Sequence, residues 1–351
     1  MEPTRPGEIE SADRHIAPRD ALELQLTQIW EDLLGHRPIG VDEDFFQLGG
    51  DSLMAMSLLA RIVQQTGMTL PAAGIVRAPT IEKLAKVLRE DSNPADWSAL
   101  VPIQTEGSKL PLFCIHPGGG NVLCYLQLAR LLAPERPFYG LQCPGVDGIR
   151  EPLATVEEMA EEYVAAMRRV QPRGPYAIGG WSVGGVLAYE MAQRLRASGD
   201  DVRLLAIIDS GVLYSCAIVT ALFPKGEIGV LDMLRLSSSE QLSEFRRRSA
   251  PARLIPEDAD ERLARQIFHL FTSNMHAVLN YRAEPYEGKI TLFQASEGIV
   301  KRRFEPAREW PRMCDDVEVH MVPGNHLTLI QEPHIDVLAQ RLARCLEAVE
   351  P

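Results

Sequence analysis

Hydrophobic and polar residues follow two different patterns along this chain of 351 residues, and the pattern changes near residue 100. Before that point, apolar residues recur every three or four positions, which is the spacing of one face of an α-helix. Beyond it, short apolar runs alternate with longer helical patterns, as in a mostly parallel sheet with helices on both faces. The sequence therefore predicts an all-α domain followed by an α/β domain.

The all-α domain is expected to contain four helices. The first begins at Pro18, because proline suits the first helical turn, and ends at Gly35, because glycine readily closes a helix. The second begins at about Ser52 and ends at Gly67. The polar, aperiodic residues 1–16 predict a disordered leader or the end of an upstream segment. The four predicted helices cover residues 18–35, 52–67, 72–77 and 80–90.

A short linker is expected between the two domains. The stretch at residues 91–100 shows no period, and its ten residues reach about 35 Å at most. The linker itself is placed at residues 92–100. Such a linker keeps the domains, at residues 17–91 and 101–351, close together while leaving them free to reorient.

Strands and helices alternate through the α/β domain. The predicted strands cover residues 111–115, 136–141, 175–180, 203–208, 289–295 and 316–322. The predicted helices cover residues 121–132, 155–170, 183–198 and 334–348. Between Asp209 and Lys289 the alternation stops, and helical patterns near 228–248 and 258–281 fill a long insertion. Because such an insertion usually covers a site, residues 210–286 are predicted to form a lid.

Composition and charge exclude several classes of protein. The chain is 46% hydrophobic and 24% charged, which is typical of a globular protein, and no apolar run is long enough to span a membrane. The N-terminus lacks the apolar core of a signal peptide. The net charge is −12, and no basic cluster indicates nucleic-acid binding. The six cysteines are scattered without metal-ligand spacing, so we expect reduced thiols, no metal site and a cytoplasmic location.

One serine lies where a strand is predicted to turn sharply into a helix. The segment GWSVG at residues 180–184 has the pattern G-x-S-x-G, directly after one predicted strand and before one predicted helix. This is the context of a nucleophile elbow, in which glycines let the strand and the helix cross closely around the serine. The pattern predicts that Ser182 is a nucleophile.

A serine nucleophile needs a base, and the base needs an orienting acid. His326 lies between the last predicted strand and the last helix, where such a base is expected, whereas His320 lies within the strand and is expected to pack or face solvent. Asp209 directly follows a buried strand and is the first choice for the acid, with Glu297, one strand later, as the alternative. Either choice keeps the order serine, acid, histidine.

A glycine run, HPGGGN at residues 116–121, follows the first predicted strand of the α/β domain. Glycines there allow backbone N–H groups to approach a developing oxyanion, together with the N–H of Val183. Gly118 is the favoured donor and Gly119 the alternative. A tight turn between strand and helix would by itself also favour glycine here. His116 is expected to be a structural neighbour and not a catalyst.

A second serine, Ser52, lies in the segment FFQLGGDSL at residues 45–53. A serine that opens a helix could be only an N-cap. The whole segment, however, with helices on both sides, resembles the peptidyl carrier domain of nonribosomal peptide synthetases over about residues 18–90. That resemblance implies that Ser52 carries 4′-phosphopantetheine through a phosphodiester, with the acyl chain on its terminal thiol. Acyl carriers of polyketide synthases are similar, although the double glycine favours the peptide branch.

Residues 101–351 resemble the type I thioesterase domain that ends such assembly lines, which implies an α/β-hydrolase fold with a helical lid. In that family the acid follows the strand that ends at Asp209, which supports Asp209 over Glu297. Cys143 stands where alanine is common and Asn325 precedes the histidine, and neither departure disturbs a catalytic role. The matching segments are PLFCIHPGGG at 111–120, YGLQCPG at 139–145, GGWSVGG at 179–185 and IDS at 208–210.

Together the resemblances imply a carrier followed by the enzyme that releases its cargo. The acyl group on Ser52 passes to Ser182 and leaves by hydrolysis or macrocyclisation. The implied partners are a phosphopantetheinyl transferase and upstream condensation and adenylation domains, with a monomer as the default state. The stretch before the first helix resembles the join to an upstream module, so we expect an excised or upstream-partnered piece.

Several alternatives stay open. The chain could belong to a polyketide or hybrid synthase, or it could be a stand-alone lidded serine hydrolase with an unrelated helical N-terminus. A carrier joined to an idle α/β module is a third possibility, against which Ser182, Asp209 and His326 argue. A reductive release domain is disfavoured, because no dinucleotide-binding glycine fingerprint opens the second domain.

Overall fold

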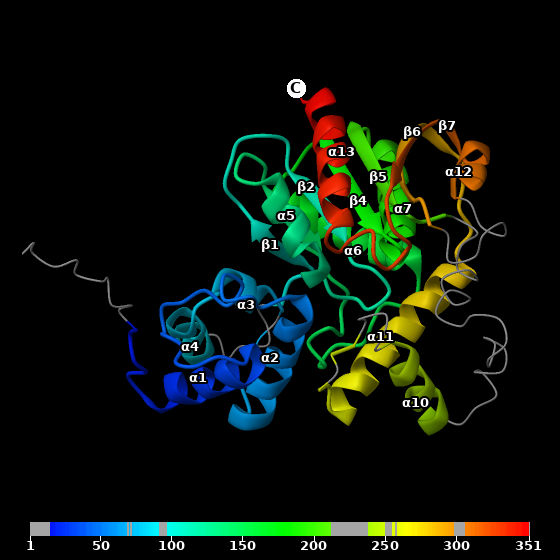
Figure 1. Ribbon diagram of the computed structural model, residues 1–351. Coiled ribbons are helices and arrows are strands. Elements are labelled where there is room, and N and C mark those ends of the chain that lie inside the picture. Colours follow the sequence, from blue (N-terminus) through cyan, green and yellow to red (C-terminus); the bar gives the residue numbers. More distant parts are fainter. Residues whose placement is uncertain are drawn as a thin grey trace, which may run out of the picture.

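The structure is a computed structural model that describes residues 15–68, 70, 72–90, 97–211, 238–249, 255–256, 258–297 and 306–350. A bundle of helices from the first 90 residues lies beside one end of an α/β domain (Figure 1). Two helices of the predicted lid extend past the same end, next to the bundle (Figure 1). The bundle, the sheet and the lid therefore meet in one region.

Four helices make up the described part of the bundle: α1 Ala21–Leu34, α2 Ser52–Thr66, α3 Ala72–Arg77 and α4 Ile81–Glu90. They agree with the predictions except at the start of α1, which the sequence predicts at Pro18. The carboxylate of Asp20 accepts hydrogen bonds from the N–H groups of Leu22 and Glu23. The helix therefore begins after Asp20, because this side chain provides the cap that Pro18 cannot.

The core of the bundle includes two side chains of the α/β domain. Trp30 and Phe45 are fully buried, with their ring centroids 4.9 Å apart. Leu123 and Leu126 of the α/β domain pack into the same apolar cluster, and the Arg130 guanidinium lies 4.9 Å above the ring of Phe46. The two domains are thus in direct contact.

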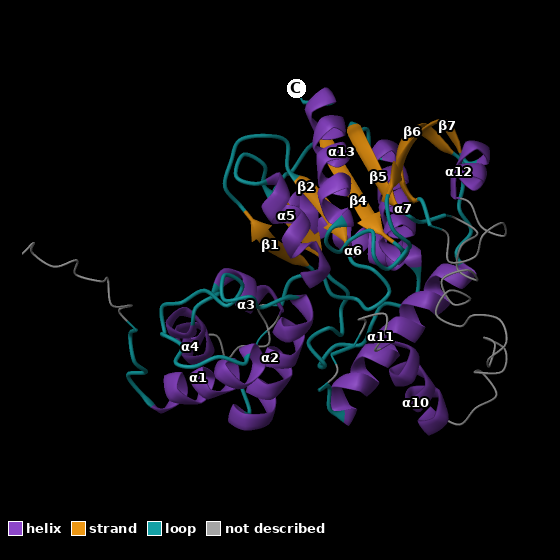
Figure 2. Cartoon of the chain, in the orientation of Figure 1, coloured by secondary structure: helices purple, strands orange, loops and turns teal. Residues whose placement is uncertain are grey.

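Seven strands in the described part of the chain form one sheet in the order β1-β3-β2-β4-β5-β6-β7 (Figure 2). Neighbouring strands are parallel except β1 and β3. The strands are β1 Leu100–Gln104, β2 Leu112–Ile115, β3 Phe138–Leu141, β4 Tyr176–Trp181, β5 Val202–Ile208, β6 Tyr286–Ala295 and β7 Cys314–Val322. A mostly parallel sheet covered by helices confirms the predicted α/β class.

Alternate residues of the central strands face two layers of helices, since side chains alternate across a sheet. Ile178 and Leu205 join a core with α6 Val156–Arg168 and α7 Val183–Ala197. Ala177 joins the opposite core, which includes α5 Leu126–Leu132 and α13 His334–Ala348. A short 3-10 turn, η2 Leu123–Tyr125, precedes α5.

Two short parts of the α/β domain were not predicted. Strand β1 begins at Leu100, the last residue of the predicted linker, and the rest of that linker falls largely outside the described residues. Its proline, Pro102, is tolerated because β1 is an edge strand. The second part is a pair of turns before β7, α12 Pro306–Glu309 and η3 Trp310–Arg312.

The described part of the predicted lid contains α10 Ser238–Ser249 and α11 Glu261–Asn280. The prediction of a helix near 258–281 agrees with α11, which is capped by the Asp260 side chain. The prediction near 228–248 agrees with α10 from residue 238 onward, and its earlier residues lie outside the described ranges. Among the described helices, none combines the length and apolar character needed to span a membrane.

Candidate active site and carrier attachment site

Ser182 lies at the turn between β4 and α7. Its φ of 61° and ψ of −126° place it in a sparsely populated region, which costs about 1–3 kcal/mol and is typical of functional sites. Both flanking glycines are required, because a Cβ on Gly180 would collide with the backbone of Gly184, and a Cβ on Gly184 with the carbonyl of Ile115. The crossing of strand and helix therefore holds Ser182 in one position.

His326 forms hydrogen bonds with both predicted partners. Its Nε2 lies 3.2 Å from Ser182 Oγ, and its Nδ1 lies 2.8 Å from Asp209 Oδ2. An ionised carboxylate only accepts hydrogen bonds, so Nδ1 donates to Asp209 and Nε2 accepts from the serine hydroxyl. Ser182, Asp209 and His326 are 5%, 6% and 4% exposed. The arrangement has the geometry of a nucleophile, a base and an orienting acid.

Asp209 is held in place by the neighbouring strand. Its N–H donates to the carbonyl of Phe293 at 2.7 Å, and its Oδ1 accepts from the N–H of Ala295 at 2.9 Å. These two bonds direct the other carboxylate oxygen toward His326. Glu297, the alternative acid, is an exposed residue. The geometry therefore favours Asp209 over Glu297.

The turn that carries His326 is stabilised by its neighbours. Asn325 Oδ1 accepts from the N–H groups of Leu327 at 3.0 Å and Thr328 at 3.1 Å. The indole Nε1 of Trp181 donates to the carbonyl of His326 at 3.0 Å. Asn325 thus stabilises the turn that carries His326, and Trp181 connects that turn to β4, the strand that precedes Ser182.

His116 and His320 have structural surroundings. His116 is fully buried, with Nδ1 donating to the carbonyl of Pro117 at 2.8 Å and Nε2 accepting from the hydroxyl of Tyr163 at 2.7 Å. Burial lowers the pKa of His116 to about 4, so the ring is neutral at pH 7. The ring of His320 stacks on Phe293 with centroids 5.3 Å apart.

One group of possible metal ligands occurs within the described ranges, formed by Glu318, His320 and Cys345. The carboxylate of Glu318 is already paired with Lys289 at 2.8 Å. The Lys289 ammonium occupies the carboxylate that a metal cation would need. The cluster is therefore explained as a surface ion pair beside a stacked histidine.

The predicted oxyanion loop lies against the first residue of α7. A Cβ built on Gly118 would lie 3.8 Å from Cγ2 of Val183, the residue directly after Ser182. The glycine loop and the start of the helix are therefore adjacent, as backbone donors to one oxyanion need to be. The donor roles of Val183 and of Gly118 or Gly119 remain predictions.

Ser52 opens α2 but does not cap it. The cap is Asp51, whose carboxylate accepts from the N–H groups of Leu53 and Met54, each at 2.9 Å. The simple explanation of Ser52 as an N-cap therefore does not hold. Its side chain is half-buried at the first helical position, where the N–H groups of a helix favour an attached phosphate. The position fits a phosphodiester on Ser52.

The double glycine ahead of Ser52 is required by the fold. Gly49 has a φ of 96°, which side chains rarely tolerate, and a Cβ on Gly50 would collide with the ring and the carbonyl of Phe45. The N–H of Gly50 also donates to that carbonyl at 2.9 Å. The loop is thus pressed onto buried Phe45, and this contact sets the direction in which α2 begins.

The helix that begins at Ser52 also contacts the lid. Asp258, just ahead of α11, accepts from Ser57 Oγ at 2.6 Å and from Arg61 Nε at 3.1 Å. Ser57 and Arg61 are four residues apart and share one helical face. Partial burial raises the pKa of Asp258, but the hydrogen bonds from Ser57 and Arg61 outweigh it and lower the pKa. One carboxylate ahead of α11 therefore joins α2 to the predicted lid.

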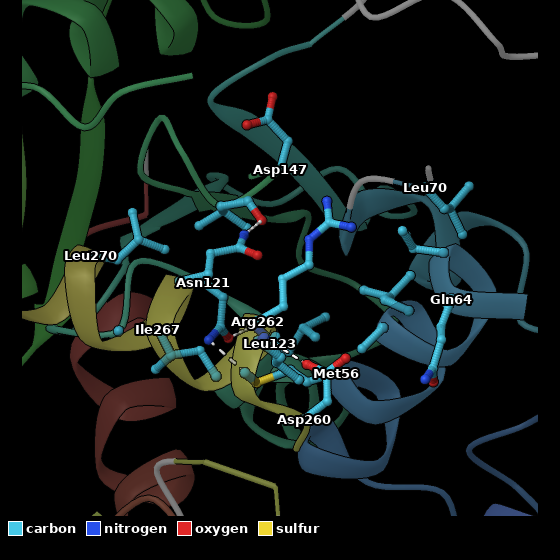
Figure 3. A pocket seen from close by; sticks show the side chains of 17 residues that line it. Met56, Gln64, Leu70, Asn121, Leu123, Asp147, Asp260, Arg262, Ile267 and Leu270 are labelled. Atoms are coloured by element: carbon cyan, nitrogen blue, oxygen red, sulfur yellow. Dashed lines mark hydrogen bonds between the residues drawn. The ribbon is translucent and has the colours of Figure 1, made fainter. Parts of the chain in front are cut away.

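A cavity of about 310 Å³ lies beside this contact, between α2, the glycine loop and α11 (Figure 3). On one side, Asn121 Nδ2 and Met56 Sδ are 3.6 Å apart. Arg262 of α11 extends between Asp147 and α2 (Figure 3). The helix α11, the glycine loop and α2 thus line one partly polar cavity.

Comparison with known proteins assigns the two parts of the chain to two families. Residues 25–88 match the phosphopantetheine attachment site family, and residues 110–346 match the thioesterase domain family. The second match covers more than half of the chain.

Two curated relatives are large synthetases. Chondramide synthase cmdD of Chondromyces crocatus is 31% identical to this chain over 95% of its length, but that alignment covers 9% of the synthase. A dimodular nonribosomal peptide synthase of Bacillus subtilis is 30% identical over 94% of this chain and 14% of the relative. The chain therefore spans a small part of the proteins it resembles.

Solved structures agree with this division. A four-domain nonribosomal peptide synthetase crystallised with AMP and glycine matches 97% of this chain and 27% of its own, with a TM-score of 0.62 and 28% identity. The NocB thioesterase domain from the nocardicin cluster matches 69% of this chain and 95% of its own, with a TM-score of 0.54 and 27% identity. This chain belongs to the thioesterase domain family, and a phosphopantetheine attachment domain precedes its thioesterase domain.

Proposed function

We propose that the chain is the terminal carrier and release module of a nonribosomal peptide assembly line. The observation that carries the proposal is the hydrogen-bonded set of Ser182, His326 and Asp209 in a chain whose Ser52 helix contacts the lid of the same thioesterase domain. When bound at Ser52, 4′-phosphopantetheine supplies the thiol that holds the acyl chain as a thioester.

In the first half of the reaction, Ser182 Oγ attacks the thioester carbonyl while His326 Nε2 takes the hydroxyl proton. Asp209 stabilises the resulting imidazolium through Nδ1. The N–H groups of Val183 and of the Gly118 loop stabilise the oxyanion. As the carbon–sulfur bond breaks, His326 returns the proton to the sulfur, and the acyl group remains on Ser182 as an ester.

The second half uses the same side chains with a new nucleophile. Water, or a hydroxyl or amine of the acyl chain, attacks the ester while His326 accepts its proton. His326 then protonates Ser182 Oγ as the carbon–oxygen bond breaks. Attack by water gives a free acid, and attack by the acyl chain itself gives a macrocycle.

The proposal includes the partners that such a carrier needs. A phosphopantetheinyl transferase modifies Ser52, and upstream condensation and adenylation domains deliver the acyl chain. The proposed setting is the cytoplasm, with the chain acting as a monomer. Relatives named as nonribosomal peptide synthases support the peptide branch, although a polyketide or hybrid synthase would use the same two serines.

Intact-protein mass spectrometry tests both halves of the proposal on one sample. With a series of acyl-coenzyme A donors and a broad-specificity phosphopantetheinyl transferase, the protein is expected to gain one acyl-phosphopantetheine and then to lose only the acyl mass. A folded protein that gains no mass would contradict the carrier half and leave a stand-alone lidded hydrolase. Acyl groups that all persist would contradict the release half.

The assignment of the acid is tested by a pair of matched substitutions. Asp209→Asn is expected to lower kcat for a soluble thioester by about 10⁴-fold, because an amide cannot stabilise the imidazolium or hold its tautomer. Glu297→Gln is expected to leave kcat unchanged. Steady-state hydrolysis measures both, and the reverse pattern would move the role of the acid to Glu297.

The contact between the carrier and the lid is tested at Asp258. Asp258→Asn is expected to slow single-turnover transfer from Ser52 to Ser182 by up to about fivefold, because an exposed ion pair contributes at most about 1 kcal/mol. Hydrolysis of a soluble thioester should not change. Arg265→Ala, which removes the exposed ion pair with Glu261 on α11, is the control and should have no effect. Equal slowing of the soluble reaction would show that Asp258 acts through the lid alone.

A further inference from the structure

A buried asparagine of the lid contacts the predicted oxyanion loop. Asn274 of α11 is fully buried, and its Nδ2 donates to the carbonyl of Gly118 at 3.0 Å. Its Oδ1 lies 3.5 Å from the Sγ of Cys143 and accepts from that thiol. No motif in the sequence includes Asn274. A side chain of the lid thus holds the loop beside Ser182.

The two partners fix the orientation of the amide. A carbonyl oxygen only accepts hydrogen bonds, so the NH2 group must face Gly118 and the oxygen must face Cys143. Burial raises the pKa of Cys143 to about 12, so its thiol keeps the proton that it donates. The N–H of Cys143 also donates to the carbonyl of Gly120 at 2.8 Å. Asn274 is therefore the centre of a fully buried network that joins two loops.

The bond to Gly118 fixes a whole peptide plane. A trans peptide is planar, so its N–H points opposite to its carbonyl, and the N–H of Gly119 is directed away from Asn274. The preceding peptide is held within the loop, where the carbonyl of Pro117 accepts from the N–H of Gly120 at 2.9 Å. Glycines on both sides of the Gly118–Gly119 peptide give it no steric preference of its own. Its orientation therefore depends on an outside partner.

We propose that Asn274 is a positioning residue that presents the Gly119 N–H to the oxyanion formed at Ser182. This inference rests on the proposed function. It selects Gly119 over Gly118 as the partner of the Val183 N–H. If the Gly118–Gly119 peptide flipped, the carbonyl oxygen of Gly118 would face the developing negative charge in place of the Gly119 N–H.

Two substitutions test the inference. Asn274→Ala removes the donor, and Asn274→Asp keeps the size of the side chain while replacing the donor with an acceptor. Removing one oxyanion donor lowers kcat by about 10²–10³-fold, and we expect misorienting one to lower it by about 10- to 100-fold, with KM unchanged. Rates are expressed per competent site, counted by end-point titration of Ser182 with a fluorophosphonate. An unchanged kcat per site in both variants would overturn the inference.

The control residue lies on the same helix. Thr272 is exposed, and within the described ranges its hydroxyl donates to carbonyls of its own helix, those of Phe268 and His269. Thr272→Ala should therefore keep the wild-type kcat. If Asn274 only stabilises the fold, its variants will lower Tm and the number of competent sites but not kcat per site, which contradicts positioning. A wild-type protein whose Ser182 does not react with the fluorophosphonate would instead contradict the proposed function itself.

Discussion

Ser182→Ala is expected to slow release of an acyl group from Ser52 by about 10⁶-fold. The variant keeps His326 and Asp209 but has no oxygen that can form the ester intermediate. The change removes one atom from a residue that is 5% exposed, so the elbow should stay intact. Intact-protein mass spectrometry of the loaded variant should show the acyl group remaining on the carrier while the wild-type protein loses it.

The matched control is at the other end of α7. Ser198 caps that helix, and its hydroxyl donates to the carbonyl of Arg194 at 2.8 Å, so Ser198→Ala should release the acyl group at the wild-type rate. Rapid release by Ser182→Ala would contradict the assignment of the nucleophile and, with it, the roles of His326 and Asp209.

Ser52→Ala is expected to abolish loading and to leave the thioesterase intact. Without the hydroxyl no phosphodiester can form, so coenzyme A and a transferase should add no mass. The cap of α2 is Asp51, so the helix keeps its first-turn hydrogen bonds, and the free energy of unfolding should change little. Hydrolysis of a soluble thioester should proceed with unchanged kcat and KM.

Ser57→Ala is the control for this experiment. Ser57 lies on the same helix and donates to Asp258, so its loss affects the contact with the lid but leaves the attachment site in place. The variant should gain one phosphopantetheine as the wild type does. A mass gain in Ser52→Ala would show that the attachment serine lies elsewhere.

Long periodic elements were predictable from the sequence, and short edge elements were not. The apolar face of α2 and the strand–turn–helix around Ser182 depend on neighbouring residues, and local patterns therefore reveal them. Strand β1 is only five residues long and contains Pro102. Val101 is fully buried, and its partner on β3 is Gly140. That pairing is a tertiary contact which no local pattern encodes.

The residues of the candidate site likewise divide into those that local patterns predict and those that depend on tertiary contacts. Ser182 and Ser52 lie in local motifs, and His326 follows from its place after the last strand. Reasoning from residues alone left Asp209 and Glu297 open, and the N–H of Ala295 that orients Asp209 is visible only in the fold. Asn274 was missed, because a polar residue on an amphipathic helix has many explanations and its partner, Gly118, is distant in sequence.

The exposed ion pair between α2 and the lid has a consequence for traffic along the proposed assembly line. A carrier that stays on its release enzyme cannot be loaded again by other domains. Here Asp258, whose side chain is 39% exposed, forms an ion pair with Arg61, beside the apolar packing of Leu123 and Leu126 into the bundle core. An exposed pair of this kind changes the lifetime of a docked state by about fivefold at most. The ion pair therefore adds little to the time that the carrier stays docked, and the millimolar local concentration set by a short tether brings a released carrier back often.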